Sequence, residues 1–149
     1  KVSQVDSTTV EQLRHRAGQL MPELPAGQDA HLQPLLVAGL GRHPGLKMLL
    51  LSSSDGRALA FASARLQADP RRVCAMGNSF LTLGETLARE LGLSASSHVT
   101  LSTGQGNMVL VRVSGSSPCT LAALADGSMP LAMLLYVARD CASQVAAAP

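Results

Sequence analysis

The chain has 149 residues, 46% of them hydrophobic, and a formal net charge of +2. This length and hydrophobic content predict one domain with its own core and argue against extensive disorder. The twelve basic residues are scattered and only 2% of residues are aromatic, so neither the basic face nor the stacking aromatics of a nucleic-acid-binding protein are expected.

The three cysteines, Cys74, Cys119 and Cys141, lie far apart in the sequence. An odd number without a CxxC pair indicates neither a disulfide framework nor a zinc site, so we expect small buried side chains in a reducing compartment. No apolar run approaches the ~18–20 residues of a membrane span, and no secretory signal opens the sequence. The expected location is the cytoplasm, without membrane insertion.

The first 28 residues differ from the rest of the chain. They are polar and end in MPELPAGQ, whose two prolines and glycine are typical of a linker. A short helix is expected within residues 7–20, where Leu13, Ala17 and Leu20 form a thin apolar face. We therefore predict an N-terminal extension over residues 1–28 and one domain over residues 29–149.

The domain is expected to begin with a helix that is capped by Asp29 and ends near Gly41. Two strands follow, over residues 46–52 and 58–64, joined by the polar segment SSSDGR. This segment lacks the spacing and the lysine of a phosphate-binding loop, and it lacks the GxSxG pattern of a serine nucleophile. An Asp-Gly pair between two apolar runs favours a hairpin turn instead.

The strongest helix signal covers residues 69–93, with Asp69 as N-cap, Pro70 in the first position and Gly92 at the end. Its apolar arc covers about half of the helix, against the ~100° of an ordinary surface helix. One stripe consists of Val73, Met76, Phe80, Leu83, Leu87 and Leu91, and it is widened by Cys74, Gly77, Leu81, Gly84 and Ala88. Such a helix is either buried within its own monomer or packs one edge on the sheet and the other on a second subunit. We favour the second interpretation.

Three strands are expected next, over residues 98–103, 107–113 and 119–125, because glycine-containing loops separate these runs. A last helix from Pro130 to about Val145 has a single apolar stripe and should lie flat on the sheet. The order helix, strand, strand, helix, strand, strand, strand, helix predicts an α+β sandwich on an antiparallel sheet.

The titratable residues do not form a catalytic constellation. The four histidines lie in four different segments without metal-ligand spacing. The segment GQGN lacks the third glycine and the following helix of a dinucleotide fingerprint. The sequence therefore predicts no enzyme, no cofactor and no metal.

Four segments of the chain resemble the roadblock family of dynein light chains and bacterial GTPase regulators. They are LKMLLLSSSDGRALA, MGNSFLTLGETLARELGL, VTLSTGQGNMVLVRV and LAALADGSMPLAMLLYVARDCASQV, and the resemblance covers about residues 29–146. It implies a profilin- and longin-like fold, with a five-stranded antiparallel sheet, one long helix on one face and two helices on the other. It also implies a homodimer in which the long helices lie side by side and the third strands join the sheets.

We expect a dimer interface and a partner-binding face on and beside the long helix. The interface is assigned to small and apolar residues that would let another helix approach closely: Cys74, Gly77, Leu81, Gly84, Ala88, Val99 and Leu101. The partner-binding face is assigned to polar residues of the same helix: Asn78, Thr82, Glu85 and Arg89.

The resemblance implies a regulatory role. The gliding-motility type of the family is a dimeric GTPase-activating protein that inserts no arginine finger, and other members are scaffolds. Two functions therefore remain open. The first is a non-catalytic homodimer that binds a small Ras-like GTPase, with or without stimulating its GTP hydrolysis. The second is a structural adaptor dimer that tethers other proteins and has no nucleotide role.

Overall fold

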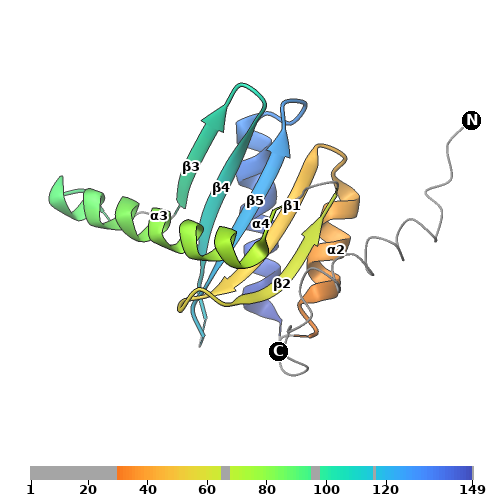
Figure 1. Ribbon diagram of the computed structural model, residues 1–149, viewed down its shortest axis with the longest axis horizontal. Helices are drawn as coiled ribbons and strands as arrows, with labels where there is room; N and C mark the ends of the chain where they lie inside the picture. The colour runs from red at the N-terminus through yellow and green to blue at the C-terminus, as the bar shows by residue number, and fades with distance from the viewer. Residues whose placement is uncertain (1–29, 65–67, 95–97, 116, 149) are drawn as a thin grey trace, which may run out of the picture.

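The computed structural model describes residues 30–64, 68–94, 98–115 and 117–148 (Figure 1). The elements in chain order are α2 Gln33–Arg42, β1 Leu46–Ser53, β2 Ala58–Ser63, α3 Pro70–Glu90, β3 His98–Thr103, β4 Gly106–Val113, β5 Cys119–Asp126 and α4 Leu131–Ala147. This is the predicted order, and the α+β fold class is confirmed. The extension predicted over residues 1–28 and the cap predicted at Asp29 lie outside the described residues.

The five strands form one antiparallel sheet in the order β2-β1-β5-β4-β3. Figure 1 shows α3 on one face of this sheet and α2 and α4 on the other. Strand β1 is buried on both faces, because Leu49 and Leu51 belong to the core under α2 and α4, whereas Met48 and Leu50 belong to the core under α3. Its continuous apolar run is what a strand covered on both sides requires.

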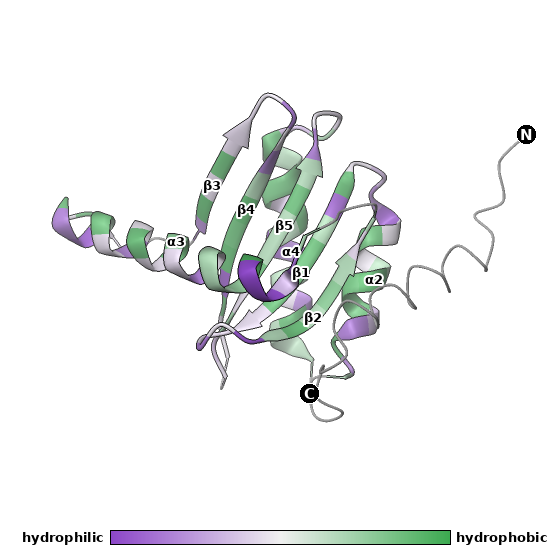
Figure 2. Cartoon of the chain, in the orientation of Figure 1, coloured by the Kyte–Doolittle hydropathy of each residue, from purple (hydrophilic) through white to green (hydrophobic). Residues whose placement is uncertain are grey.

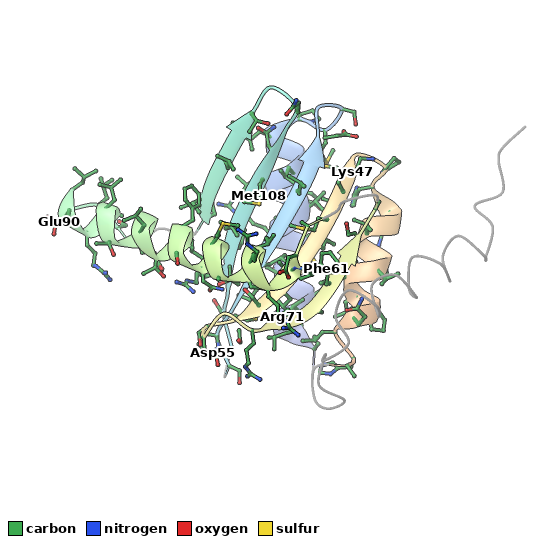
Figure 3. All side chains as sticks on the ribbon, viewed as in Figure 1. Lys47, Asp55, Phe61, Arg71, Glu90 and Met108 are labelled. Atoms are coloured by element: carbon green, nitrogen blue, oxygen red, sulfur yellow. The ribbon has the colours of Figure 1, made fainter. Side chains whose placement is uncertain are left out.

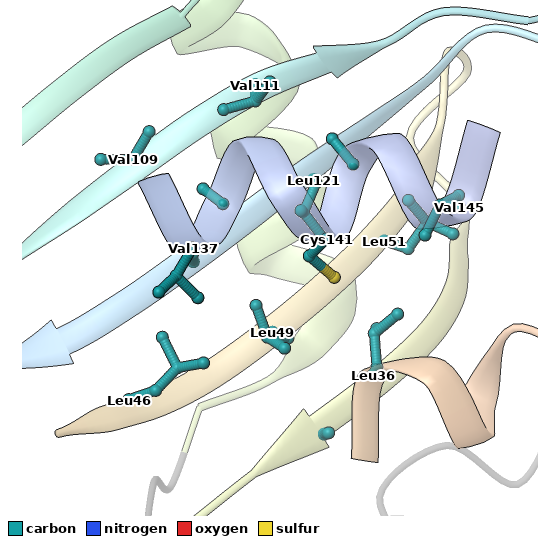
Figure 4. Close-up of a cluster of buried hydrophobic side chains, with 14 of the residues drawn as sticks. Leu36, Leu46, Leu49, Leu51, Val109, Val111, Leu121, Val137, Cys141 and Val145 are labelled. Atoms are coloured by element: carbon teal, nitrogen blue, oxygen red, sulfur yellow. The ribbon is translucent and has the colours of Figure 1, made fainter. Parts of the chain in front are cut away.

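The larger core lies between the sheet and helices α2 and α4. Leu36 of α2 and Val137 and Cys141 of α4 belong to it, together with Leu49 of β1 (Figure 4). The core under α3 is smaller, and its buried members are Met48, Leu50, Phe61, Cys74, Leu110 and Ala122. One helix thus covers a sheet face of the same width as the face that two helices cover.

The segment SSSDGR is a hairpin turn between β1 and β2, as predicted. The backbone N–H of Ser53 donates to the carbonyl of Arg57 at 2.8 Å, and that of Gly56 donates to the carbonyl of Ser53 at 3.0 Å. Gly56 has a φ of 87°, a conformation that glycine adopts without strain. The turn therefore joins two strands and is not a phosphate-binding loop.

Helix α3 has the caps that the sequence predicts. The Asp69 carboxylate accepts a hydrogen bond from the Arg71 backbone N–H at 3.0 Å, and Pro70 is the first helical residue. Gly92, with a φ of 69°, follows the last turn in the left-handed conformation typical of helix ends.

One edge of the sheet is capped by a side chain. The Gln33 amide of α2 donates to the Phe61 carbonyl at 2.5 Å and accepts from the Phe61 N–H at 2.9 Å. Phe61 lies on the edge strand β2, so Gln33 occupies two of the backbone groups that a further strand would use. Natural sheets block open edges in ways of this kind, because a bare edge invites pairing with another chain.

We predict that Gln33→Leu, which keeps the size of the side chain, lowers the free energy of unfolding by about 1–3 kcal/mol, the usual cost of leaving polar groups unsatisfied. Urea denaturation measures this change. The matched control is Gln105→Ala, at an exposed glutamine in the β3–β4 turn, which should change stability by less than about 0.5 kcal/mol. Equal stability of the wild type and Gln33→Leu would contradict a capping role.

Candidate functional site

The long helix α3 crosses the sheet and overhangs it. Its first turns lie over β1 and β2, and its last turns, where Glu90 is labelled, project past β3 (Figures 1 and 3). Five strands about 4.8 Å apart make a sheet about 19 Å wide, whereas the 21 residues of α3 extend for about 31 Å. The C-terminal part of α3 therefore reaches beyond the sheet of its own chain.

One face of α3 packs on its own sheet. Cys74 and Leu81 are buried in this contact. A Cβ atom added to Gly77 would lie 3.2 Å from Leu110 Cδ2, and one added to Gly84 would lie 2.6 Å from Val99 Cγ1. The small residues of α3 therefore let the sheet approach closely.

The predicted dimer interface stays a prediction, and this packing shows where the structure places its seven residues. Five of its residues are buried in the chain or directed at its own sheet: Cys74, Gly77, Leu81, Gly84 and Ala88. Val99 faces Gly84, and only Leu101, which is 48% exposed, presents a large apolar side chain to solvent. The physical reason is space, since glycine and cysteine fit the narrow gap between a helix and a sheet that it crosses.

A second face of α3 is apolar and exposed. It consists of Met76, Phe80, Leu83, Leu87 and Leu91, whose exposed fractions run from 40% to 67%. We call these five residues the α3 stripe. Their spacing of four and three residues places them in one row. Figure 2 shows that hydrophobic and hydrophilic residues alternate along α3. Single exposed apolar side chains are ordinary, but a contiguous row of five is typical of a surface that binds another protein.

Asn78 joins α3 to the sheet beneath it. Its Nδ2 donates to Ser52 Oγ at 3.0 Å and to the Cys74 carbonyl at 2.9 Å, and its Oδ1 accepts from Thr120 Oγ1 at 3.1 Å. The two hydroxyl-bearing residues, Ser52 and Thr120, are 4% and 1% exposed. Asn78 therefore satisfies two polar side chains that water scarcely reaches.

Arg112 of β4 extends this network. Its Nη1 donates to Thr120 Oγ1 at 3.2 Å, and its Nη2 lies 2.6 Å from Glu85 Oε1 of α3. Both charged side chains are about 70% covered by protein. A pair that is partly shielded from water contributes more than an exposed pair, and removing one partner leaves the other uncompensated.

A groove of about 590 Å³ runs between the β1–β2 turn and the polar side of α3. The turn contributes Ser54, Asp55 and Gly56, and the helix contributes Ala75, Asn78, Ser79, Thr82, Leu83 and Thr86. Leu83 also belongs to the α3 stripe, so the groove borders the apolar surface directly. Hydroxyl groups beside an apolar row can hold a polar segment of a protein partner.

Asp55 places a negative charge at the rim of this groove. Its carboxylate accepts a short hydrogen bond from the Ser53 hydroxyl, and Arg57 Nε lies 3.2 Å from its Oδ2. The Ser53 hydrogen bond, followed by the Arg57 charge, lowers the pKa of Asp55. The Asp55 carboxylate therefore remains ionised at neutral pH, paired with the Arg57 guanidinium.

The structure separates the four residues predicted to bind a partner. Asn78 and Glu85 are turned toward the sheet and bonded to it. Thr82 and Arg89 are exposed, and Arg89 Nη2 donates to Thr86 Oγ1 at 3.4 Å.

Ser79 and Thr86 line the groove without having been predicted. Both are polar residues of the same helix, each directly after a residue assigned to the partner-binding face, Asn78 and Glu85.

All three cysteines are buried, as predicted. Burial raises the pKa of Cys74 and that of Cys141 to about 11, so both thiols are protonated and unreactive at neutral pH. In the described part of the chain, no group of three or more histidine, cysteine, aspartate or glutamate side chains is arranged to hold a metal ion. None of the described helices is long and apolar enough to cross a membrane.

Several solved structures have a similar fold. The chain is similar to the gliding protein MglB from Thermus thermophilus, with a TM-score of 0.70, 16% identity, and coverage of 83% of this chain and 92% of that one. It is also similar to a Roadblock/LC7 domain from Streptomyces avermitilis, with a TM-score of 0.66, 22% identity, and coverage of 76% and 92%. Profilin II from Acanthamoeba castellanii gives a TM-score of 0.56, 15% identity, and coverage of 76% and 95%.

These likenesses identify the architecture. The chain has the roadblock/LC7 fold, which is also profilin-like, and the resemblance seen in the sequence is confirmed at the level of the fold. Comparison of the sequence with protein-family models finds no match, and neither does comparison with curated proteins.

Substitution of two neighbouring residues of α3 distinguishes a residue that stabilises the fold from one that only lines the surface. Asn78→Ala should lower the free energy of unfolding by about 2–3 kcal/mol, because it leaves the buried Ser52 and Thr120 hydroxyls without this partner. Ser79→Ala, one residue further and exposed in the groove, should change it by less than about 0.5 kcal/mol. Chemical denaturation of both variants provides the comparison, and similar values for the two would contradict the network.

Proposed function

We propose that this chain is a non-catalytic, homodimeric regulatory module that acts in the cytoplasm and binds a small Ras-like GTPase. The observation that carries the proposal is the α3 stripe, which in a single chain faces water. The fold shared with the gliding protein MglB supports it, because the roadblock family that the sequence resembles includes dimeric GTPase regulators.

The two edges of the sheet favour one mode of dimerisation. Gln33 caps β2, the first edge strand, so a second copy is expected at the other edge, β3. Antiparallel pairing of β3 with its counterpart extends the sheet across a two-fold axis perpendicular to it. Leu101 lies on this strand and would be covered in the dimer.

The same axis determines how the long helices meet. A two-fold rotation about an axis perpendicular to the sheet reverses the direction of any helix that lies on its face. The two α3 helices therefore run antiparallel, and each overhanging end lies above the partner's sheet. Leu83 is near the middle of the α3 stripe and meets its own counterpart, whereas Met76 at one end meets the partner's Leu91.

Disulfide cross-linking tests the direction of pairing. We expect Leu83→Cys to form a covalent dimer under mild oxidation at pH 8, because Cα atoms at the closest approach of two packed helices lie within the reach of a disulfide. At that pH the native Cys74 and Cys141, whose pKa values are raised to about 11, are only about one part in a thousand ionised and should not compete.

Met76→Cys is the matched control, since it is exposed on the same stripe but away from the axis. Seven residues at 1.5 Å each place it about 10 Å from the axis, so the two copies lie about 20 Å apart. We expect no cross-link from this variant. A cross-link with Met76→Cys, or none with Leu83→Cys, measured by non-reducing electrophoresis, would contradict the antiparallel dimer.

The groove beside α3 is the proposed GTPase-binding site. In the dimer two grooves flank the paired helices, each with its hydroxyl groups and the anionic Asp55. Arg89 contacts Thr86 on the wall of this groove. A partner held here would be stimulated through ordering of its own switch segments, and Arg89 would serve as a docking residue.

Arg89→Ala should weaken binding of the GTP-bound partner and any stimulated hydrolysis together, by about fivefold, because an exposed charged contact contributes up to ~1 kcal/mol. The full chain is immobilised and exposed to extract of the source cells with a GTP analogue or with GDP. Retained GTPases are then purified for binding and phosphate-release assays. Arg42→Ala, on α2 at the opposite face of the sheet, is the control.

The result decides between the open functions. Loss of stimulation with unchanged binding would make Arg89 a catalytic finger and overturn the non-catalytic role. If the retained proteins do not depend on the nucleotide, the dimer is a structural adaptor, the second function that the roadblock resemblance allows.

A further inference from the structure

Helix α4 has an outer face that the described part of the chain leaves exposed. Val137, Cys141 and Val145 are directed at the sheet (Figure 4). At 100° per residue, the opposite face consists of Ala132, Met133, Tyr136, Arg139, Asp140, Ser143 and Ala147, and all seven are exposed. Met133 is 48% exposed and Tyr136 is 68% exposed.

The outer face of α4 has one projecting side chain and one hollow. Tyr136 is its largest exposed side chain. Beside it lies a hollow of about 300 Å³, lined by Ala132, Leu135, Tyr136, Arg139, Asp140 and Ser143. The small residues Ala132 and Ser143 stand one turn before Tyr136 and about two turns after it.

The charges on this face are balanced and adjacent. Arg139 Nη2 lies 3.3 Å from His98 Nδ1 of β3, and Asp140 Oδ2 accepts from Gln144 Nε2 at 2.9 Å. Both charged residues are exposed, so each retains capacity for a further contact. A positive and a negative residue in sequence, on one face, are what a two-fold symmetric contact needs.

We propose that the outer face of α4 binds the same face of a second copy of this chain, with the two α4 helices antiparallel. An axis midway between Arg139 and Asp140 pairs each of these residues with the opposite charge of the partner. It also places Tyr136 opposite the partner's Ser143, within the hollow, and Ala132 opposite the partner's Ala147. Met133 then lies opposite the partner's exposed Ala146, so the two largest apolar side chains of the outer face both meet small residues.

This contact lies on the opposite side of the sheet from the α3 stripe (Figure 1). The two surfaces therefore do not compete, and a chain that uses both assembles beyond the dimer. Two different two-fold contacts per chain produce either a closed tetramer or an open row. The face of a single helix buries little area, so the α4 contact is weaker than a standard interface and forms at micromolar or higher concentration.

Charge exchange tests the pairing directly. Sedimentation velocity of the full chain over about 1–200 μM should show assembly beyond the dimer for the wild type. Arg139→Asp and Asp140→Arg should each abolish it, because like charges then meet across the axis. The double variant Arg139→Asp/Asp140→Arg should restore it, since opposite charges face each other again.

Substitution at the α3 stripe separates this inference from the proposed dimer. Leu83→Glu should disrupt the α3 contact and leave a dimer formed through α4, and Leu83→Glu/Tyr136→Glu should be monomeric. If the proposed α3 dimer does not form but the α4 contact does, the wild type should be a dimer, and Tyr136→Glu should convert it to a monomer. The proposal is overturned if no variant or concentration reveals an association that Tyr136→Glu removes, or if the double charge exchange fails to restore what either single change removed.

Discussion

The structure depends on the close approach of a single helix to one face of a five-stranded sheet. On the other face α2 and α4 share that task. Helix α3 crosses the strands, and by doing so it reaches β1 at one end and β3 at the other. It still leaves Leu101 exposed and Met108 and Leu124 half-buried on the same face. Helices α2 and α4 therefore cover their face of the sheet, whereas α3 leaves part of its face exposed. A partner would bury the most apolar surface on the α3 side.

The close approach of α3 to the sheet also explains why its two apolar faces differ in the size of their side chains. The face toward the sheet is built from small residues, with Gly84 so near Val99 that a Cβ would lie 2.6 Å from it. The large residues of the α3 stripe are left for solvent. Periodicity in the sequence identified both rows and the N-cap at Asp69. It could not tell which row faces the sheet, because both are apolar and the choice depends on the gap between elements.

The polar contacts under α3 were the least predictable part of the site. Asn78 and Glu85 lie at helical spacing from Cys74 and Leu81, so a polar residue inside the buried row was visible in the sequence. Their partners were not visible, since Thr120 and Arg112 are 42 and 27 residues away from them. Such pairs follow from strand register across the sheet, and register is fixed by tertiary packing. Order, turns and caps were predictable because they depend on neighbouring residues.

The proposed dimer contact and the proposed partner-binding groove share a residue. Leu83 lines the groove and also lies near the middle of the α3 stripe. A second chain seated on the α3 stripe would thus form part of the groove's apolar wall, and a protein in the groove would contact both chains. The asymmetry of the sheet edges supports this arrangement, because a capped β2 leaves β3 as the place where the sheet can grow. In such a molecule a binding surface for a third protein is assembled by the dimer and does not exist in full on one chain.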